Sequence, residues 1–364
     1  MNASASAIVI AAGGTGGHIF PALSVALELR RRFPATPLLW IGTSRSRERE
    51  LCERNGIPAE MLDVEGIRRT MSLSALRAIL RFCTAVLRMM RLFGAGRPRA
   101  VVAFGGYVCA PVLAAARLRR VPYFLQEQNT VAGLVNRLFA GQARRVFLGF
   151  PLAGRRPLRC TSELTGTPVR RRQESYPGFA YPAGFAKGKT TILICGGSQG
   201  AQSMNGALLA VVKKWADRGL QVIWQTGAAS FEGIAGEFKR HGGVFVFSTI
   251  ADLYPYYAAA KLLVGRAGAS TLAEASCFGL PAVLVPLPWA AENHQWVNAG
   301  VVESQGWGIR VAQNSETGAG VEKAVDTILS NEKTYNAMRM KALDNSPAQA
   351  AEKIAAGLAK ELGL

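Results

Sequence analysis

A short apolar run that ends in glycines and leads into a helical pattern occurs twice, and this repeat constrains the fold most. Residues 192–195 are apolar and lead into the glycine-rich run 196–200, after which residues 201–212 have a helical pattern. Residues 7–12 are equally apolar and lead into Gly13-Gly14-Thr15-Gly16-Gly17-His18, with a helical pattern over 21–31. Such a turn brings free backbone N–H groups to a helix N-terminus, where they suit an anion. We therefore predict an α/β protein with two doubly wound domains and a cleft between them.

The length agrees with two domains, and the net charge indicates a polyanionic partner. The chain has 364 residues, of which 49% are hydrophobic, and a formal net charge of +19. A charge of this size favours binding to nucleic acid, an anionic membrane or a phosphate-rich substrate. An arginine-rich surface that only keeps the protein soluble is the alternative.

Cysteine and histidine usage argues against a metal centre. The six cysteines form no Cys-x-x-Cys pair and the chain has only three histidines, so we expect reduced thiols and no zinc site. The first basic residue is Arg30, which is not typical of a signal peptide. The longest uncharged apolar stretch, 100–116, is short and interrupted by glycine and proline, so we expect no transmembrane helix.

The first glycine turn does not fit a nicotinamide dinucleotide. Ile19 stands where the last glycine of a Gly-x-Gly-x-x-Gly pattern belongs, and no acidic residue follows the predicted strand 38–42. These features argue against NAD. NADP is a weaker alternative, because Arg45 and Arg47 could hold its extra phosphate.

The segment from Gly66 to Gln126 contains eleven arginines and no acidic residue. Within it, residues 72–93 are predicted to form a helix that places four arginines in one stripe and is apolar over most of its remaining surface. One interpretation is a core helix with a solvated arginine face, and the other is an element that lies on an anionic bilayer. The residues predicted to face a membrane are Arg68, Arg69, Leu76, Arg77, Ile79, Leu80, Arg81 and Arg88.

Polar residues follow predicted strands, where open α/β sheets bind ligands. The strand 122–125 leads into Gln126-Glu127-Gln128-Asn129, and the strand 100–104 leads into Gly105-Gly106-Tyr107. An ordinary polar loop is the alternative for the first of these. The strand that begins at Val146 is predicted to be the last of the first domain, and 151–164 to be a connection. The predicted domains are 1–163 and 164–345, with residues 346–364 as a helix that packs back on the first domain.

Taken together, the motifs resemble glycosyltransferase family 28 of bacterial cell-wall synthesis. The resemblance covers nearly the whole chain, and one glycine loop alone would be weak, whereas six motifs in order are specific. They are 13–18, Phe104-Gly105-Gly106-Tyr107, Glu127-Gln128-Asn129, Gly166-Thr167-Pro168-Val169-Arg170, Gly196-Gly197-Ser198-Gln199-Gly200-Ala201, and 268–274 with His294-Gln295. The family implies the GT-B architecture of two Rossmann-like domains. Thr167 departs from the asparagine that the family commonly has.

The resemblance implies transfer of N-acetylglucosamine from UDP-N-acetylglucosamine to the 4-hydroxyl of muramoyl-pentapeptide on undecaprenyl diphosphate (lipid I), with inversion, which forms lipid II for peptidoglycan. It implies a peripheral enzyme at the cytoplasmic face of the bacterial inner membrane, connected with cell shape and division. It leaves open association with cell-wall synthesis and division proteins, and it implies no nucleic-acid partner. The donor positions that it implies are Thr15, Gly16, Gly17, Asn129, Arg170, Ser198, Gln199, Ile250, Ala269, Ser270, Thr271, Leu272, Glu274 and Gln295. The implied acceptor side holds Gly14, Gly105, Gly106 and Tyr107.

Two residues are candidates for the base that takes the acceptor proton, and the sequence does not choose between them. His18 stands at a helix N-terminus, where the helix dipole favours a neutral imidazole; the alternative is a histidine that only caps the turn. Glu127 is the second candidate. No Asp-x-Asp motif is present, so we expect departure of UDP without a metal or other cofactor, helped by helix N-termini and Arg170.

Two rival functions remain. Another GT-B sugar-nucleotide enzyme, such as a UDP-N-acetylglucosamine 2-epimerase or a lipid or natural-product glycosyltransferase, would share the fold; an epimerase needs no membrane-facing surface. A non-enzymatic binder of nucleic acid or anionic lipid would need exposed aromatic residues among its basic ones. Residues 66–99 offer only Phe82 and Phe93, both in core-like positions.

Overall fold

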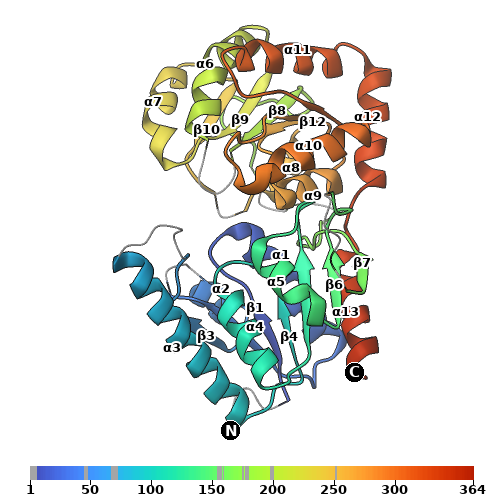
Figure 1. Ribbon diagram of the computed structural model, residues 1–364. Coiled ribbons are helices and arrows are strands. Elements are labelled where there is room, and N and C mark those ends of the chain that lie inside the picture. The colour runs from blue at the N-terminus through green and yellow to red at the C-terminus, as the bar shows by residue number, and fades with distance from the viewer. Residues whose placement is uncertain are drawn as a thin grey trace. The chain divides into compact units, whose positions relative to one another are not determined.

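The chain divides into two compact units. The first unit comprises Met1–Arg170 and Ala348–Leu364, and the second comprises Arg171–Pro347. The expected boundaries, after 163 and after 345, lie a few residues before these. The computed structural model describes residues 6–44, 48–66, 73–153, 158, 160–173, 176, 180–196, 201–250 and 252–364 (Figure 1).

The first unit is a parallel sheet covered by helices on both faces, with strand order β3-β2-β1-β4-β5-β6-β7 (Figure 1). Such a sheet needs apolar strands because both of its faces are buried, and β1 is fully buried. Its elements are β1 (Ile8–Ala11), α1 (Gly16–Arg32), β2 (Leu38–Thr43), α2 (Glu48–Arg54), β3 (Ala59–Leu62), α3 (Leu73–Ala95), β4 (Ala100–Ala103), α4 (Cys109–Leu118), β5 (Tyr123–Glu127), α5 (Leu134–Phe139), the 3₁₀ turn η1 (Ala140–Gln142), β6 (Arg145–Leu148), β7 (Ser162–Leu164) and α13 (Ala350–Leu362).

The second unit repeats this plan with strand order β10-β9-β8-β11-β12-β13, all parallel in register. Its elements are β8 (Thr191–Cys195), α6 (Gln202–Asp217), β9 (Gln221–Gln225), α7 (Ala228–Phe238), β10 (Val244–Phe247), α8 (Tyr254–Ala259), β11 (Leu262–Gly265), α9 (Ala269–Cys277), β12 (Ala282–Leu284), the 3₁₀ turn η2 (Ala291–Asn293), α10 (His294–Ser304), β13 (Gly308–Arg310), α11 (Thr317–Leu329) and α12 (Glu332–Asp344). The predicted α/β class with two doubly wound sheets is confirmed.

The connection predicted over 151–164 is wrong in part. Its last residues form β7, which pairs in parallel with β6, so β6 is not the last strand of the first sheet. Ser162 and Leu164 are exposed, which is why this short edge strand lacks the apolar pattern of the others. Helix α1 also begins earlier than predicted, because its first turn holds two glycines and a histidine rather than an apolar stripe.

The C-terminal helix α13 completes the core of the first unit. Ile354, Ala355 and Leu358 are fully buried in the same cluster as Ile8 and Phe147. The contact is close at Gly357, where a β-carbon would lie 2.9 Å from the Phe147 ring. At the end of the helix, the Arg145 guanidinium joins Glu163 of β7 and Glu361 of α13, both at 2.7 Å. The helix is therefore part of the first unit's fold.

We predict that Ile354→Ala lowers the free energy of unfolding of the first unit by about 3 kcal/mol, because it leaves a cavity among fully buried side chains. Lys353→Ala, on the exposed side of the same helix, should change it by less than about 0.5 kcal/mol. Urea unfolding followed by tryptophan fluorescence measures both. Equal effects of the two variants would contradict the packing described here.

Candidate active site

The two glycine turns of the first unit meet where its sheet changes direction. The chain leaves β1 toward β2 and leaves β4 toward β5, on opposite sides, and ligands bind at such a switch point in open α/β sheets. A β-carbon on Gly106 would overlap the Gly13 carbonyl oxygen, and Gly106 has a φ of +85°. Gly105 has a φ of +109°. The turn after β4 therefore lies directly against the turn after β1 and requires glycine.

His18 lies in the first turn of α1 with its imidazole held in one orientation. Its Nδ1 is 3.3 Å from the Gly13 carbonyl oxygen, and because a carbonyl only accepts, this contact needs the proton on Nδ1. The Nε2 atom is then left as an acceptor. Burial lowers the pKa of His18 from 6.5, an effect that the Gly13 hydrogen bond and the Glu48 charge oppose. At neutral pH His18 thus has the protonation state of a general base.

The space around Nε2 depends on the turn after β4. A β-carbon on Gly105 would lie 2.6 Å from Cδ2 and 2.8 Å from Nε2 of His18. Any other residue there would crowd the edge of the ring that a proton donor must reach. Next along the chain, Tyr107 is 64% exposed, and Gly14 and Thr15 are exposed on the neighbouring turn. The structure thus brings Gly105, a predicted acceptor-side residue, against the His18 ring, although the two motifs lie far apart in the sequence.

Glu127 is the last residue of β5 rather than part of a loop, and it is 2% exposed. Its Oε1 accepts the Asn129 backbone N–H at 3.0 Å, and its Oε2 accepts the Gly133 N–H and Asn136 Nδ2, both at 2.8 Å. The placement of Gln126 and Glu127 in a loop after the strand was wrong, because the strand extends through them. The carboxylate of Glu127 holds residues 129–136 in place, and both of its oxygens are occupied.

From the sequence, Gln128 was named only as part of a polar run, and no role was predicted for it. It is buried, its Nε2 donates to the Phe104 carbonyl at 2.6 Å, and its own carbonyl accepts from Thr167 Oγ1 at 3.4 Å. These bonds join the ends of β4 and β5 to the segment that leads to Arg170. Thr167 thus serves as a hydroxyl donor at this position. Arg170 is exposed and is the last residue of the first unit's long segment.

In the second unit the sheet changes direction between β8 and β11, and the predicted donor residues follow its strands. Ile250 follows β10, and Ala269, Ser270, Thr271 and Leu272 form the first turn of α9, with Glu274 one turn further. Gln295 lies in the first turn of α10, where its Oε1 accepts the Leu287 N–H at 3.0 Å. Ser198 and Gln199 lie outside the described residues, as do Arg45, Arg47, Arg68 and Arg69.

Arg266 is a buried cation at the carboxyl end of β11 that sequence reasoning missed. It is 6% exposed, its Nη1 donates to the Val285 carbonyl at 2.9 Å, and its Nη2 lies 3.4 Å from Ser203 Oγ in the first turn of α6. Burial lowers the pKa of Arg266 to about 10, so it is charged at neutral pH. The sequence signal that could have identified Arg266 is a charged residue directly after an apolar strand. It adds positive charge beside two helix N-termini.

Helix α3 carries the predicted membrane-facing residues, and two of its arginines have acidic partners. Arg81 lies 3.0 Å from Glu65 and 3.3 Å from Asp63, and Arg88 lies 2.5 Å from Glu60. These pairs reduce the positive charge that the arginine stripe presents. The same helix exposes large apolar side chains on the side away from the core, namely Leu76, Ile79, Leu80 and Leu87.

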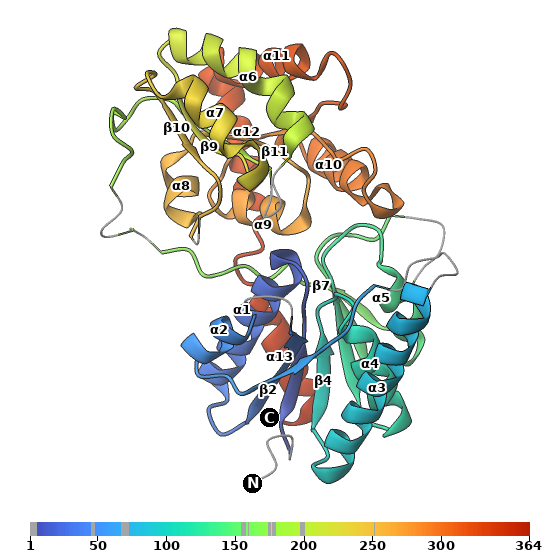
Figure 2. The ribbon, with the colours of Figure 1, turned by 90° about the vertical axis from the view of Figure 1, so that its left-hand side faces the viewer.

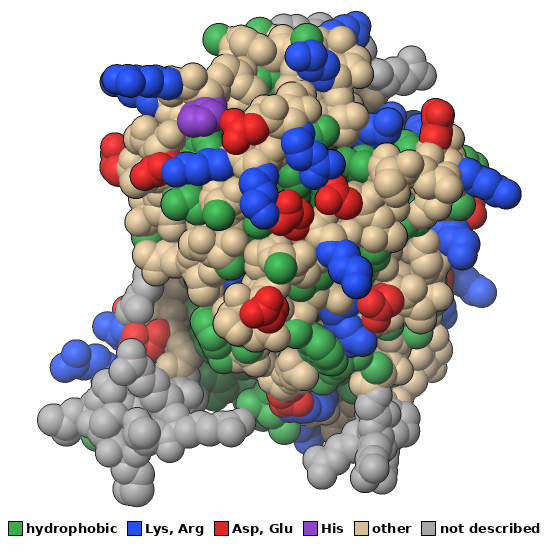
Figure 3. Space-filling model, turned by 90° about the horizontal axis from the view of Figure 1, so that it is seen from above, with side chains coloured by type: hydrophobic (Ala, Val, Ile, Leu, Met, Phe, Trp, Pro, Cys, Tyr) green, Lys and Arg blue, Asp and Glu red, His purple; other side chains and the backbone are tan. Residues whose placement is uncertain are grey.

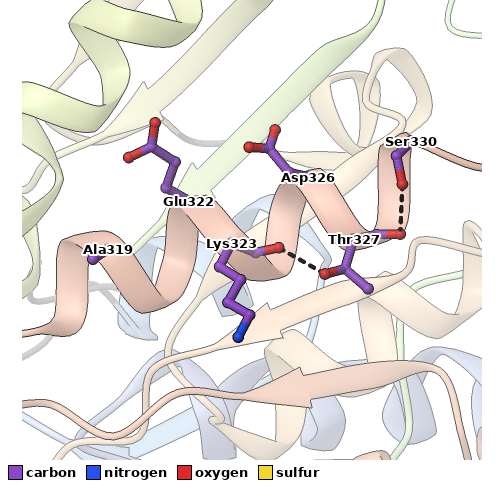
Figure 4. A pocket seen from close by; sticks show the side chains of 6 residues that line it. All are labelled: Ala319, Glu322, Lys323, Asp326, Thr327 and Ser330. Atoms are coloured by element: carbon purple, nitrogen blue, oxygen red, sulfur yellow. Dashed lines mark hydrogen bonds between the residues drawn. The ribbon is translucent and has the colours of Figure 1, made fainter.

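Among the described residues, no group of three or more His, Cys, Asp or Glu side chains is placed to hold a metal. A hollow beside α11 is lined by this helix and the residue after it, as Figure 4 shows: Ala319, Glu322, Lys323, Asp326, Thr327 and Ser330. Its two acids pair with Lys214 of α6 and with Arg218, directly after that helix, at 2.9 and 2.8 Å. No helix in the described part of the chain is long and apolar enough to cross a membrane.

Two doubly wound parallel sheets are the architecture of the GT-B class of α/β proteins. Comparison with known sequences gives the family. Residues 8–148 match the glycosyltransferase family 28 N-terminal domain, and residues 191–355 match the C-terminal domain of the same family. The chain belongs to glycosyltransferase family 28, which confirms the resemblance seen in its motifs.

Similar proteins match more than nine-tenths of the chain. A UDP-N-acetylglucosamine–N-acetylmuramyl-(pentapeptide) pyrophosphoryl-undecaprenol N-acetylglucosamine transferase of Desulforudis audaxviator is 36% identical, over 91% of this chain and 92% of that protein. The crystal structure of Acinetobacter baumannii MurG is 28% identical, with a TM-score of 0.73 over 97% of this chain and 99% of that one. A UDP-N-acetylglucosamine 2-epimerase structure shares the fold at 16% identity, with a TM-score of 0.68 over 99% and 97%.

The contact between the glycine turns makes a prediction about stability. Gly106→Ala should lower the free energy of unfolding by about 2 kcal/mol or more, because it combines a strained positive φ with overlap on the Gly13 carbonyl. Gly141→Ala is the matched control, since a β-carbon there meets nothing within 4 Å. Thermal unfolding of both variants measures the difference. A Gly106→Ala protein as stable as the control would refute the close approach of the turns.

Proposed function

We propose that this chain transfers N-acetylglucosamine from UDP-N-acetylglucosamine to the 4-hydroxyl of the muramoyl sugar of lipid I and so forms lipid II. The relationship to proteins named for this transfer, over more than nine-tenths of the chain, carries the proposal. The geometry that supports it is the orientation of His18, with Nδ1 on the Gly13 carbonyl and Nε2 free to accept a proton.

In this mechanism the acceptor's 4-hydroxyl oxygen attacks the anomeric carbon of the donor sugar from the face opposite the diphosphate. The bond from that carbon to the UDP oxygen breaks, the configuration inverts, and His18 Nε2 takes the hydroxyl proton. Glu127 is less suited to this role, because backbone and side-chain N–H groups occupy both of its carboxylate oxygens. In the proposed mechanism it positions Asn129 and the residues after it.

The departing UDP needs positive charge or hydrogen-bond donors. The first turns of α6 and α9 offer backbone N–H groups, and Arg266 places a buried guanidinium beside Ser203. Arg170 is proposed to approach the diphosphate, and Glu274 to hold the ribose hydroxyls. With these donors we infer that the reaction needs no metal or other cofactor.

The test is transfer of labelled N-acetylglucosamine to a short-chain lipid I analogue, in the presence of EDTA. Formation of a new β-1,4 linkage supports both the reaction and its independence of metal. Conversion of the donor to its manno epimer would instead favour the epimerase, a protein with the same fold. Activity that EDTA abolishes would overturn the metal-independent mechanism alone.

His18→Asn should lower kcat by about 10²- to 10⁴-fold while donor binding changes little, as expected for loss of a general base. His241→Asn, on the second unit outside the site, should leave kcat within about twofold. In the wild type, activity should fall on acidification with an apparent pKa below 6.5, because burial lowers the pKa of His18 and only the neutral ring accepts a proton. A His18→Asn enzyme with normal kcat would exclude this base.

Helix α3 supports the further proposal that the enzyme docks peripherally on the anionic cytoplasmic membrane surface to reach its lipid-linked acceptor. The helix has two apolar sides: Met89 and Phe93 are buried in the core, whereas Leu76, Leu80 and Leu87 are each more than half exposed. It lies on the outer side of α4 in the first unit (Figure 2). By contrast, acidic and basic side chains are interspersed on the surface seen in Figure 3. Exposed leucines beside arginines suit an anionic bilayer.

Replacement of Leu76, Leu80 and Leu87 together by glutamine should weaken binding to vesicles of phosphatidylethanolamine and phosphatidylglycerol about tenfold or more, since each leucine loses apolar burial in the bilayer. Met340→Gln, which changes an exposed apolar residue of α12 in the second unit, is the control. Vesicle sedimentation measures binding. Undiminished binding of the triple variant would exclude α3 as the docking element.

A further inference from the structure

Glu48 is a buried carboxylate directly behind the first glycine turn. It is the first residue of α2 and is 1% exposed. Its Oε1 accepts the Gly14 backbone N–H at 3.2 Å and Thr43 Oγ1 at 2.9 Å. Its Oε2 accepts the Thr43 backbone N–H at 3.1 Å and Trp40 Nε1 at 3.4 Å. Each of these four groups donates, so they suit an ionised carboxylate rather than a protonated acid.

The surroundings of Glu48 are shaped to hold it. A β-carbon on Gly42 would overlap Glu48 Oε2, so β2 can carry only glycine where the carboxylate lies against it. A β-carbon on Gly13 would lie 3.2 Å from Oε1. Burying a carboxylate is costly without partners, and here the partners come from β2 and from the turn after β1. The hydrogen bond to Gly14 therefore fixes the glycine turn to the neighbouring strand and helix.

One peptide unit separates this carboxylate from His18. Glu48 lies on one side of the Gly13-Gly14 segment, and the Gly13 carbonyl on the same segment meets His18 Nδ1. The carboxylate thus contributes in two ways. It orients the peptide that selects the Nδ1–H tautomer, and its negative charge faces the ring that becomes positive when Nε2 is protonated.

We propose that Glu48 is a positioning residue for the transfer reaction, which orients the glycine turn against His18 and stabilises the imidazolium formed when His18 takes the acceptor proton. This inference rests on the proposed function for its catalytic meaning. Glu48 does not touch the substrate or the reacting atoms and acts through Gly13 and His18.

Other ionisable groups near the turn do not compete with this effect. The thiols of Cys52 on α2 and Cys109 on α4 are buried, and burial raises the pKa of each to about 12. Both are therefore neutral at pH 7. Among the described residues, Glu48 is the charged group that acts on the His18 ring. Its removal should make His18 harder to protonate.

The test is an NMR titration of the imidazole Cε1–H signals in full-length protein. The chain has only three histidines, so His241 and His294 serve as internal references. In Glu48→Gln the pKa of His18 should fall by about one unit, because the neighbouring negative charge is lost, while the other two histidines keep theirs. Glu50→Gln is the matched control: it removes one charge from the same helix, at an exposed position paired with Arg54.

A His18 pKa in Glu48→Gln equal to that of the control would overturn the proposal. If Glu48→Gln does not fold, Glu48→Asp is the second test. Its shorter side chain draws the carboxylate back from the turn, so the His18 pKa should fall by less than in Glu48→Gln. An unchanged His18 pKa overturns the proposal. In transfer assays the acidic limb of the pH profile should shift with the titration, whereas a purely structural role would lower activity without moving that limb. Because the titration needs no substrate, it separates failure of this inference from failure of the transferase assignment.

Discussion

The approach of two backbone turns at the centre of the first sheet supports the rest of the candidate site. Strands β1 and β4 pair in parallel from Ile8 to Ala11, and this register brings the Gly13 peptide directly against Gly106. From this contact follow the orientation of the Gly13 carbonyl, the proton on His18 Nδ1 and the open space at Nε2. A side chain at Gly105 would fill the space beside Nε2, and one at Gly106 would overlap the Gly13 carbonyl. The chemistry therefore depends first on backbone packing, and only then on the identity of the base.

Buried polar residues then keep this edge of the sheet rigid. Glu48 attaches the turn after β1 to β2, and Gln128 attaches β5 to the end of β4. Glu127 accepts hydrogen bonds from N–H groups of the segment that follows it. Each of these side chains is at most a few per cent exposed. Satisfied polar groups in a low-dielectric interior hold a geometry tightly, and an unsatisfied one would be costly. An active-site edge built this way needs little reorganisation during the reaction.

The sequence was sufficient for the fold class, the main strands and the glycine turns of the first unit, because apolar runs bounded by glycine are local signals. The predicted strands 38–42 and 100–104 coincide to within one residue with β2 and β4. Features that depend on distant partners were not predictable. Glu48 looks like an ordinary charge in an arginine-rich stretch until Trp40 and Gly14 surround it, and the acidic partners of Arg81 and Arg88 lie on and just after β3. β7 was missed because an exposed edge strand has no apolar run.

The place of α13 has a consequence for how the polypeptide is made. The first unit takes its core residues Ile354, Ala355 and Leu358 from a segment that is translated after all of the second unit. During synthesis the second unit can fold as soon as it leaves the ribosome, whereas the first unit must wait with an open apolar groove over α1 and β6. The first unit, whose synthesis begins first, is thus the last to complete its fold. A nascent chain stalled within the second unit would display that groove, which makes it a recognisable substrate for chaperones.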